Sequence, residues 1–456
     1  MIPPERHVPL LFILALAACG SGGPPPIPDA AGTQVTQVTL LRWPVGGGTP
    51  ALYRFPTLAP ARWEAHGTTP ALTRVVGVDL DQGQAYALDR AEVVYALDLE
   101  SGRARPFLRD VVQAASGPDG VVYAVATDRT LSSVARRLPN AYPGKLPAVP
   151  VGLVGTGSDQ VYALFPGDSG LVVATQSQAP RRLPFPAAHA VHAPWGDIFA
   201  AGTADGVALL EPGDRDTPPR LDVGGKPQGL AFSPSGHRLY VTVAGDAQVQ
   251  SFDRYTWRRV ARWDLPGDGA ALRPDPMGRF LLVRPADGDS IWVVDVIKGE
   301  LLASWNTGWK DDLPTVAGGR WLLVREGADV VAYDLLASDL KESGRVKKGA
   351  ADLWQVLDWS PRTEAAVAAG PDTAAAAPAA PTAVVYVQLS SSQNPAWAEE
   401  LSSKLKRQGL PASVIRPRKS DEFYRVVLGP YPSREAADSA GTRLGQPYFL
   451  YLPEDR

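Results

Sequence analysis

Turn residues recur along the middle of this 456-residue chain at a nearly constant spacing. Short apolar runs of alternating polarity fill residues 35–369, and turns separate them. The turns lie 37 to 42 residues apart and are centred on Gly83, Gly120, Ser158, Gly196, Gly236, Gly278, Gly319 and Ser360. A fixed period of this length indicates a repeat architecture in which each repeat is one supersecondary unit.

The repeats also share their internal order. Leu230–Val241 and Leu272–Val283 both read as a strand, a turn with Pro and Gly, and a second strand. A further apolar run that ends on Asp follows each of them, and such endings occur at Asp98, Asp253, Asp295 and Asp334. Four antiparallel strands in about 40 residues are typical of a propeller blade. We therefore predict an all-β propeller over residues 35–369, with Gly at hairpin positions of positive φ and Asp between the third and fourth strands.

The later repeats resemble the YVTN-like and quinoprotein-type propeller repeats, over roughly residues 70–360. The turns predict seven or eight four-stranded blades: eight if every turn is real, and seven if the first or the last is false. After Ser360 only one more strand fits, at residues 365–369, which leaves the last blade two strands short. We predict that residues 35–43 and 51–55 supply those two strands and so close the ring.

Composition and charge exclude several classes of protein. A hydrophobic fraction of 45% excludes wholesale disorder, and 44 Gly with 44 Pro agree with many turns. The formal net charge is −3, so the chain lacks the basic excess typical of nucleic-acid binding, and no nucleic-acid partner is predicted. The chain has one cysteine, which rules out an intrachain disulfide and a zinc site built from several cysteines.

The first residues are typical of an export signal. The apolar run at residues 8–18 is too short to span a bilayer as a helix, and it ends in Leu16-Ala17-Ala18-Cys19-Gly20. This ending resembles the bacterial lipobox. The resemblance implies a lipoprotein signal peptide over residues 1–18, lipid attachment at Cys19, and a membrane anchor of acyl chains. The alternative is an ordinary signal peptide followed by an incidental cysteine.

Two segments are predicted to be spacers. Residues 19–34 are rich in Pro and Gly, and residues 370–382 are rich in Ala and Pro without a large apolar side chain. The first would hold the body off the membrane, and the second would separate two domains. Gly20 after the lipid site favours the outer membrane if the enterobacterial sorting rule applies.

The propeller region offers few candidates for chemistry. His189 and His192 are three residues apart, which in a strand places them on opposite faces, unlike a metal pair on a helix. Asp311 and Asp312 are adjacent, and we expect a solvated turn there rather than an acid–base pair. No nucleophile elbow, HExxH motif or P-loop is present. We therefore predict no catalytic residue, metal or cofactor.

The pattern changes after residue 382. Strands are predicted at residues 384–389, 412–415, 423–428 and 448–452, and helices at residues 395–407 and from Ser433 onward, with Ser433 as the N-cap. The order βαββαβ within residues 383–456 predicts a small α+β, ferredoxin-like domain with both helices on one face of the sheet.

The motifs of this domain resemble those of SPOR domains. They are Tyr386-Val387-Gln388-Leu389-Ser390, then Leu401, Leu405 and Gly409, then Tyr424 to Tyr431, and Ser433-Arg434-Glu435-Ala436-Ala437. The resemblance implies binding to peptidoglycan, in particular to glycan strands stripped of stem peptides at the division septum. By motif position it implies that the binding residues are Gln388, Ser390, Arg425 and Tyr431.

The sequence qualifies this site in two ways. Period two places Gln388 and Ser390 on one face, whereas Arg425 and Tyr431 must reach them by strand pairing. Gln388 could instead be merely solvent-exposed. In addition, Ser390-Ser391-Ser392 stands where the family commonly has Gly-Ser-Phe, so one aromatic residue is missing.

The lipobox, the propeller repeats and the SPOR domain motifs together predict a non-enzymatic envelope lipoprotein on the periplasmic side, enriched at the septum. Its propeller is expected to bind an unidentified envelope protein. Two alternatives remain open. One is a propeller enzyme of the lactonase or polysaccharide lyase type that SPOR targets to the wall, and the other is a propeller that senses a small ligand.

Overall fold

The structure is a computed structural model that describes most of two regions, residues 38–359 and 385–451. The gaps within them are residues 81, 118–119, 136–137, 156–159, 166–170, 184, 188, 195–197, 212–217, 393–394, 408–409, 417–423, 432, 434–435, 438–439 and 442–447. The predicted signal peptide, Cys19, both spacers and the strand at residues 365–369 lie outside the described residues. No helix in the described regions is long and apolar enough to cross a membrane.

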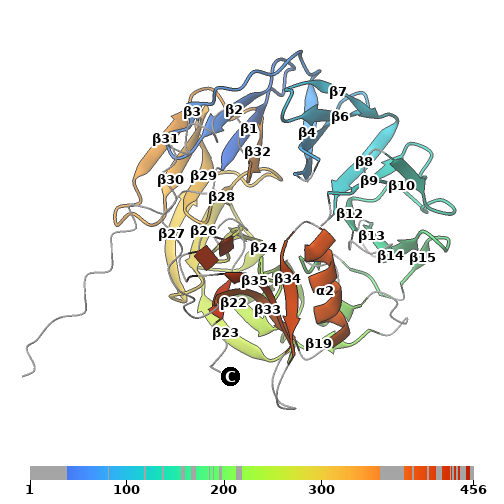
Figure 1. The fold of residues 1–456 in the computed structure, drawn as a ribbon, viewed down its shortest axis with the longest axis vertical. Coiled ribbons are helices and arrows are strands. Elements are labelled where there is room, and N and C mark those ends of the chain that lie inside the picture. The colour runs from blue at the N-terminus through green and yellow to red at the C-terminus, as the bar shows by residue number, and fades with distance from the viewer. Residues whose placement is uncertain are drawn as a thin grey trace, which may run out of the picture. The chain divides into compact units, whose positions relative to one another are not determined.

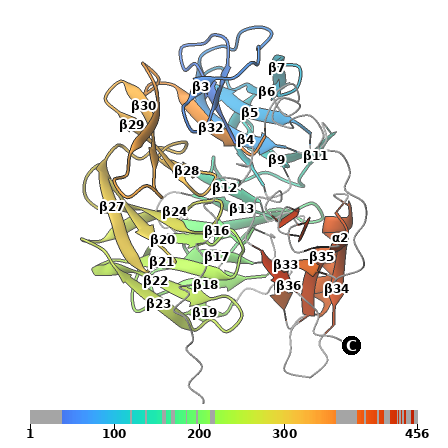
Figure 2. The same cartoon turned by 60° about the vertical axis from the view of Figure 1, so that its left-hand side comes forward.

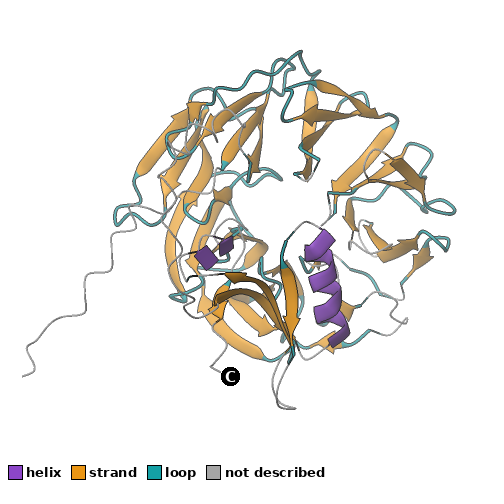
Figure 3. Cartoon of the chain, in the orientation of Figure 1, coloured by secondary structure: helices purple, strands orange, loops and turns teal. Residues whose placement is uncertain are grey.

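Eight four-stranded antiparallel sheets follow one another around a ring in the described part of the chain (Figure 1; Figure 3). Blades 1 to 3 consist of β4 (Leu72–Asp79), β5 (Gln84–Asp89), β6 (Val94–Asp98) and β7 (Ala104–Leu108); β8 (Val111–Ser116), β9 (Val122–Ala126), β10 (Leu131–Ala135) and β11 (Leu138–Ala141); and β12 (Gly152–Gly155), β13 (Gln160–Leu164), β14 (Leu171–Thr175) and β15 (Arg181–Arg182). Blades 4 and 5 consist of β16 (His189–His192), β17 (Phe199–Gly202), β18 (Val207–Leu210) and β19 (Arg220–Leu221); and β20 (Pro227–Phe232), β21 (Arg238–Val243), β22 (Asp246–Asp253) and β23 (Arg259–Asp264). Blades 6 and 7 consist of β24 (Gly269–Pro274), β25 (Phe280–Pro285), β26 (Ser290–Asp295) and β27 (Glu300–Asn306); and β28 (Thr315–Ala317), β29 (Trp321–Glu326), β30 (Asp329–Asp334) and β31 (Glu342–Val346).

Blade 8 joins the two ends of the ring. Its strands are β32 (Leu353–Leu357), β1 (Thr39–Trp43), β2 (Ala51–Arg54) and β3 (Ala59–Pro60), in this order from the inside outward. The predicted closure by both ends and the higher of the two blade numbers are confirmed. The expected division of two strands from each end is wrong, because β1 pairs directly with β32 and the early segment supplies three strands. The third, β3, is only two residues long, too short to show an alternating pattern.

The first strand of each blade is innermost, and neighbouring first strands contact one another around most of the ring. Apolar side chains from adjacent blades fill the space between them. Between blades 6 and 7, for example, Phe280 and Leu282 of β25 pack with Leu322 and Val324 of β29. The hydrophobic core is therefore a series of interfaces between sheets rather than a single centre.

The repeating turns adopt the predicted conformations. The described hairpin glycines between the first and second strands have φ between +60° and +74°: Gly83, Gly120, Gly236, Gly278 and Gly319. Ser158, Gly196 and Ser360 lie outside the described residues. The four repeated Asp residues end the third strands, and their carboxylates accept hydrogen bonds from backbone N–H groups of the following turn, as Asp295 does from Ile297 at 3.0 Å.

The C-terminal domain is the predicted α+β sandwich. It contains β33 (Val385–Ser392), α2 (Pro395–Arg407), β34 (Ala412–Ile415), β35 (Tyr424–Tyr431) and β36 (Phe449–Tyr451), with the sheet order β34-β35-β33-β36. Residues 436–437 and 440–441 are helical, and the Ser433 hydroxyl accepts a hydrogen bond from the Ala436 N–H at 3.1 Å, which confirms the predicted cap. Leu401 and Leu405 of α2, with Ala437 and Ala440, pack on one side of the sheet.

Candidate functional site

The two sides of the C-terminal sheet differ in chemistry. On one side, Val387, Leu428 and Leu450 lie opposite one another on neighbouring strands and join the core beneath the helices. Alternation along the strands places the intervening residues on the other side. Register pairs Tyr386 with Tyr451 there, so the second side carries polar and aromatic residues.

A connected row of side chains lies on that second side. Arg425 donates a hydrogen bond through Nη1 to Gln388 Oε1 at 3.2 Å, and its guanidinium carbon lies 5.3 Å from the ring centre of Tyr451. The rings of Tyr451 and Tyr386 are 6.4 Å apart and tilted by 52°. The four residues come from three adjacent strands, β35, β33 and β36, and we call them the sheet-face row.

The chemistry of the sheet-face row suits a carbohydrate. Guanidinium and amide groups donate several hydrogen bonds in fixed directions, which matches sugar hydroxyls and N-acetyl carbonyls. Aromatic rings present flat apolar surfaces on which the C–H faces of pyranose rings can stack. The hydrogen bond from Arg425 and its cation–π contact also restrict the side chain before any ligand arrives.

The structure brings together two of the four residues that the motifs suggested. Gln388 and Arg425 are in direct contact. Ser390 does not follow the expected alternation, because a register shift after Gln388 places it opposite Val426, a core residue. Tyr431 lies opposite Val385 and packs against the core of the domain. The expectation that Gln388 and Ser390 share a regular face is therefore wrong, and a β-bulge is the reason.

Sequence reasoning missed Tyr386 and Tyr451. Tyr386 stands two residues before Gln388, so strand alternation alone could have placed both on one face. Tyr451 lies in the last strand, and only pairing with β33 brings it beside Tyr386. These two rings supply aromatic surface in a domain where the motif comparison pointed to a missing aromatic residue.

The segment that builds this sheet also matches a known family. Residues 381–449 match the family described as the SPOR domain. This segment is a SPOR domain. The sheet-face row lies on the side of the SPOR domain sheet opposite the helices, where its four residues are half-buried, and Tyr451 falls just beyond the matched residues.

Solved structures confirm the fold of the propeller. Dihydro-heme d1 dehydrogenase NirN, in complex with DHE, superposes with a TM-score of 0.50 at 15% identity, covering 70% of this chain and 75% of that one. AztD from Citrobacter koseri gives a TM-score of 0.50 at 12% identity, covering 71% of this chain and 99% of its own. At these identities the likeness shows the fold alone. No curated protein matches the sequence.

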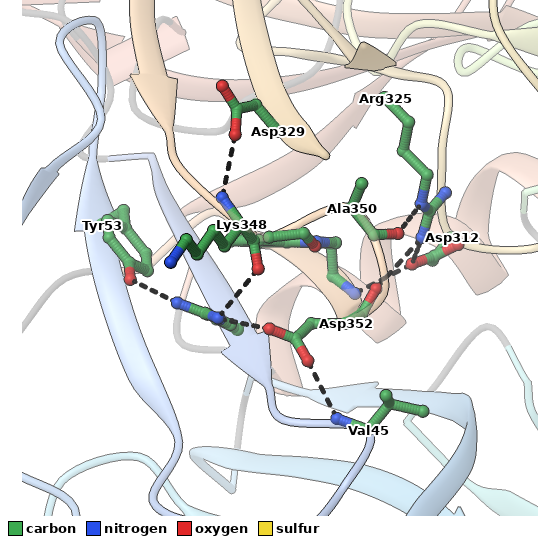
Figure 4. Close-up of polar contacts among 11 residues, drawn as sticks. Val45, Tyr53, Asp312, Arg325, Asp329, Lys348, Ala350 and Asp352 are labelled. Carbon is green, nitrogen blue, oxygen red and sulfur yellow. Dashed lines mark hydrogen bonds and ion pairs between the residues drawn. The ribbon is translucent and has the colours of Figure 1, made fainter. Parts of the chain in front are cut away.

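A polar network crosses the seam where the propeller closes (Figure 4). Arg42 on β1 contacts Asp352 with Nε and Oδ2 2.5 Å apart, and the other oxygen of Asp352 accepts a hydrogen bond from the Val45 N–H at 3.0 Å. The Thr39 hydroxyl donates to the carbonyl of Trp359 at 2.7 Å. Segments more than 300 residues apart are thus joined by charge and hydrogen bonding as well as by strand pairing.

The adjacent acidic pair is not the solvated turn that we expected. The Asp312 carboxylate is 4% exposed and contacts Arg325 at 2.6 Å, and it also accepts a hydrogen bond from the Trp354 N–H at 2.9 Å. Arg325 donates in addition to the carbonyls of Ala350 and Asp352. Asp312 therefore lies in a buried ion pair between blades 7 and 8, and only Asp311 is exposed.

Arg273 fixes the same loop from blade 6. Its Nη2 donates to the carbonyl of Lys310 at 2.9 Å, Nη1 donates to the carbonyl of Pro314, and its guanidinium stacks on Trp309 at 4.6 Å. Burial lowers the pKa of Arg273 to about 10. The group remains charged at neutral pH, so it provides a permanent positive charge beside the acidic pair.

His189 and His192 both lie on strand β16, three residues apart. His189 lies opposite Gly202 and His192 opposite Phe199. Nδ1 of His192 is 2.8 Å from the carbonyl oxygen of Ala193, and burial lowers the pKa of this imidazole. No group of three or more metal-binding side chains occurs among the residues that the structure describes.

Proposed function

We propose that this protein is a non-enzymatic envelope lipoprotein that binds peptidoglycan through its SPOR domain. The ligand is the glycan strand stripped of stem peptides, which enriches the protein at the division septum. The propeller serves as a platform for an unidentified envelope protein. Acyl chains on Cys19 hold the chain in the membrane, with the folded domains on the periplasmic side.

One observation carries the wall-binding proposal. Arg425, Gln388, Tyr386 and Tyr451 form a connected row on the sheet face that the helices leave uncovered, in a segment that matches the SPOR domain. A strand without stem peptides exposes alternating hydroxyl, N-acetyl and pyranose C–H surfaces. The hydrogen-bond donors and the two rings complement these surfaces.

The proposal of an interaction platform rests on the architecture of the propeller. Eight blades present many turns on two faces, and such surfaces commonly bind partners. Asp312 and Asp352, two acidic groups at the closing seam, each form an ion pair with an arginine. An activity that opens lactones or cleaves wall polysaccharides, measured with the purified protein, would contradict the non-enzymatic assignment.

Binding to purified sacculi tests the function directly. We expect the protein to sediment with sacculi, and the bound amount to rise after an amidase has removed the stem peptides. Deletion of residues 383–456 should abolish binding while the propeller remains folded. Binding that persists without these residues, or that amidase treatment leaves unchanged, would exclude the proposed ligand.

A further inference from the structure

Exposed apolar side chains gather on one part of the propeller. Eight large hydrophobic residues are exposed in the described regions, and five of them lie on blades 5 to 7. We call these five the apolar rim: Tyr255, Val260, Ile297, Leu301 and Leu336. Ile297 is the most exposed of them, with 76% of its surface accessible to solvent. Large apolar groups in such a cluster usually mark an interaction surface.

The repeat geometry places the apolar rim on one side of the ring. Tyr255, Ile297 and Leu336 each stand two residues after a repeated Asp, in the turn between the third and fourth strands. Blades 5 and 6 are consecutive in the ring, and Figure 2 shows β22 and β23 of blade 5 next to β27 of blade 6. In blade 1 the corresponding position is Glu100, an exposed charged residue.

Two outer strands extend the apolar rim. Val260 lies near the start of β23, and Leu301 lies near the start of β27. These strands are the outermost of their blades, and they contact each other. Val260 and Leu301 therefore lie on neighbouring outer strands, which follow the turns that carry Tyr255 and Ile297.

Basic residues flank the blade 5 part of this set. Segments 253–262, 295–301 and 334–342, which carry the apolar rim, contain six Lys or Arg and six Asp or Glu, so the basic excess lies on blade 5 alone, where segment 253–262 contains four Arg and one Asp. The whole chain carries a formal net charge of −3. Arg258, Arg259 and Arg262 are all exposed beside Val260, whereas Lys298, which follows Ile297, pairs with Glu300 at 3.5 Å.

We propose that the apolar rim is a membrane-contact surface for a bilayer that contains anionic lipid. Apolar side chains at the tips of separate turns can each enter the interfacial region of a bilayer, whereas the flanking arginines reach the phosphates. The combination of protruding apolar groups with the exposed arginines of blade 5 is complementary to a lipid surface of negative charge. In this arrangement the propeller lies against the membrane, beyond the contact that an acyl chain provides.

Flotation with vesicles tests the surface without an acyl anchor. A chain that begins at Gly20 keeps every described residue and lacks Cys19. We expect it to float with vesicles of phosphatidylglycerol and phosphatidylethanolamine in equal parts, and to bind phosphatidylcholine vesicles much more weakly. High salt should reduce the binding, because screening weakens the contribution of the arginines.

Matched variants separate the apolar rim from other surfaces. Ile297→Asp should weaken vesicle binding about tenfold or more, because it replaces the most exposed apolar tip by a charge that the lipid repels. Val151→Asp is the control, since Val151 is 63% exposed in the loop before β12, outside the apolar rim. Arg258→Glu and Arg262→Glu should weaken binding, and Arg109→Glu, an exposed arginine on blade 1, should not. Thermal melting verifies that each variant is folded.

A fluorescent probe gives a second readout. Cys19 is the single cysteine of the chain, so the protein that begins at Gly20 can carry one cysteine at a chosen place. A polarity-sensitive dye on Ile297→Cys should shift its emission to the blue when anionic vesicles are added, and the dye on Val151→Cys should not. Equal shifts at both positions, loss of binding in neither Ile297→Asp nor Arg258→Glu, or capture of a protein by the apolar rim without lipid binding would overturn the proposal.

Discussion

Arg325 and Asp312 form a buried ion pair across the seam of the propeller, with Nη2 and Oδ2 2.6 Å apart. Their side chains are only 9% and 4% exposed. The carboxylate also accepts the backbone N–H of Trp354 on β32, so a single acidic group connects the loop before β28, strand β29 and the closing blade. The seam therefore contains an ion pair that is almost fully buried.

Asp312→Ala should destabilise the propeller strongly. The substitution leaves the Arg325 guanidinium buried without its counter-charge, which typically costs about 3–5 kcal/mol in the free energy of unfolding. Arg220→Ala is the control, because Arg220 pairs with Asp205 at 2.5 Å on the surface and its loss should cost about 1 kcal/mol or less. Urea unfolding of both variants measures the difference. Equal losses would show that the seam does not depend on this pair.

Gly120→Ala should cost more stability than the same change at Gly83. Both residues occupy the hairpin between first and second strands, with φ of +70° and +60°. A Cβ on Gly120 would lie 2.6 Å from Cγ of Asp79, whereas nothing lies within 4 Å of one on Gly83. Backbone strain affects both variants, at about 1–2 kcal/mol, and the clash with Asp79 adds about 1–3 kcal/mol only at Gly120. Thermal denaturation compares them, and similar melting temperatures would refute this account of the turn.

Substitutions on the sheet face should separate binding from folding. Arg425→Ala and Tyr451→Ala should each weaken binding to amidase-treated sacculi about tenfold, a loss of about 1.4 kcal/mol, because each removes a ligand-facing group. Tyr431→Ala should instead lower the melting temperature of the SPOR domain, since Tyr431 packs against its core. Ser390→Ala tests the original motif assignment. If it weakened binding as much as Arg425→Ala does, the ligand would extend past the bulge.

His192 should make the propeller less stable at acidic pH. Burial lowers the pKa of the folded imidazole below its ordinary value of 6.5, so below pH 6.5 the unfolded chain binds a proton that the folded protein binds only at lower pH. The free energy of unfolding therefore falls as the pH decreases below 6.5. His192→Gln should flatten this dependence in urea titrations at a series of pH values. If the dependence of the free energy of unfolding on pH were unchanged in this variant, a group other than His192 would be responsible for it.

The regular parts of the fold could be predicted from the sequence because they follow local rules. Gly236 and Gly278 indicated hairpins since their backbone needs positive φ, and Asp253 and Asp295 indicated the turns that their carboxylates cap. Helix α2 and strand β34 were predicted with the correct ends, because Pro395, the apolar spacing and Gly409 mark them locally. These features depend on residues only a few positions apart.

The candidate site could be predicted only in part. Gln388 and Arg425 came from a motif, and alternation along one strand assigned Gln388 a face. The bulge after Gln388 has no marker in the residues around it, so the position of Ser390 was predicted wrongly. The environment of Asp312 also escaped sequence reasoning, because Arg325 and Trp354 reach it from other blades.

The sequence by itself determined the period of the repeat, a propeller of seven or eight blades, the closure by both ends of the ring, and the motifs of the SPOR domain. Only the tertiary structure decided that the N-terminal segment supplies three strands, rather than two, to the four-stranded closing blade. It also decided that Tyr386 and Tyr451 lie with Arg425 on one face of the SPOR domain sheet, and that most of the exposed apolar side chains lie on blades 5 to 7. Local backbone preferences act between residues that are only a few positions apart, so they can be predicted from the sequence. Strand register, ion pairing and the grouping of surface side chains depend on residues that are brought together only when the ring closes and the SPOR domain folds.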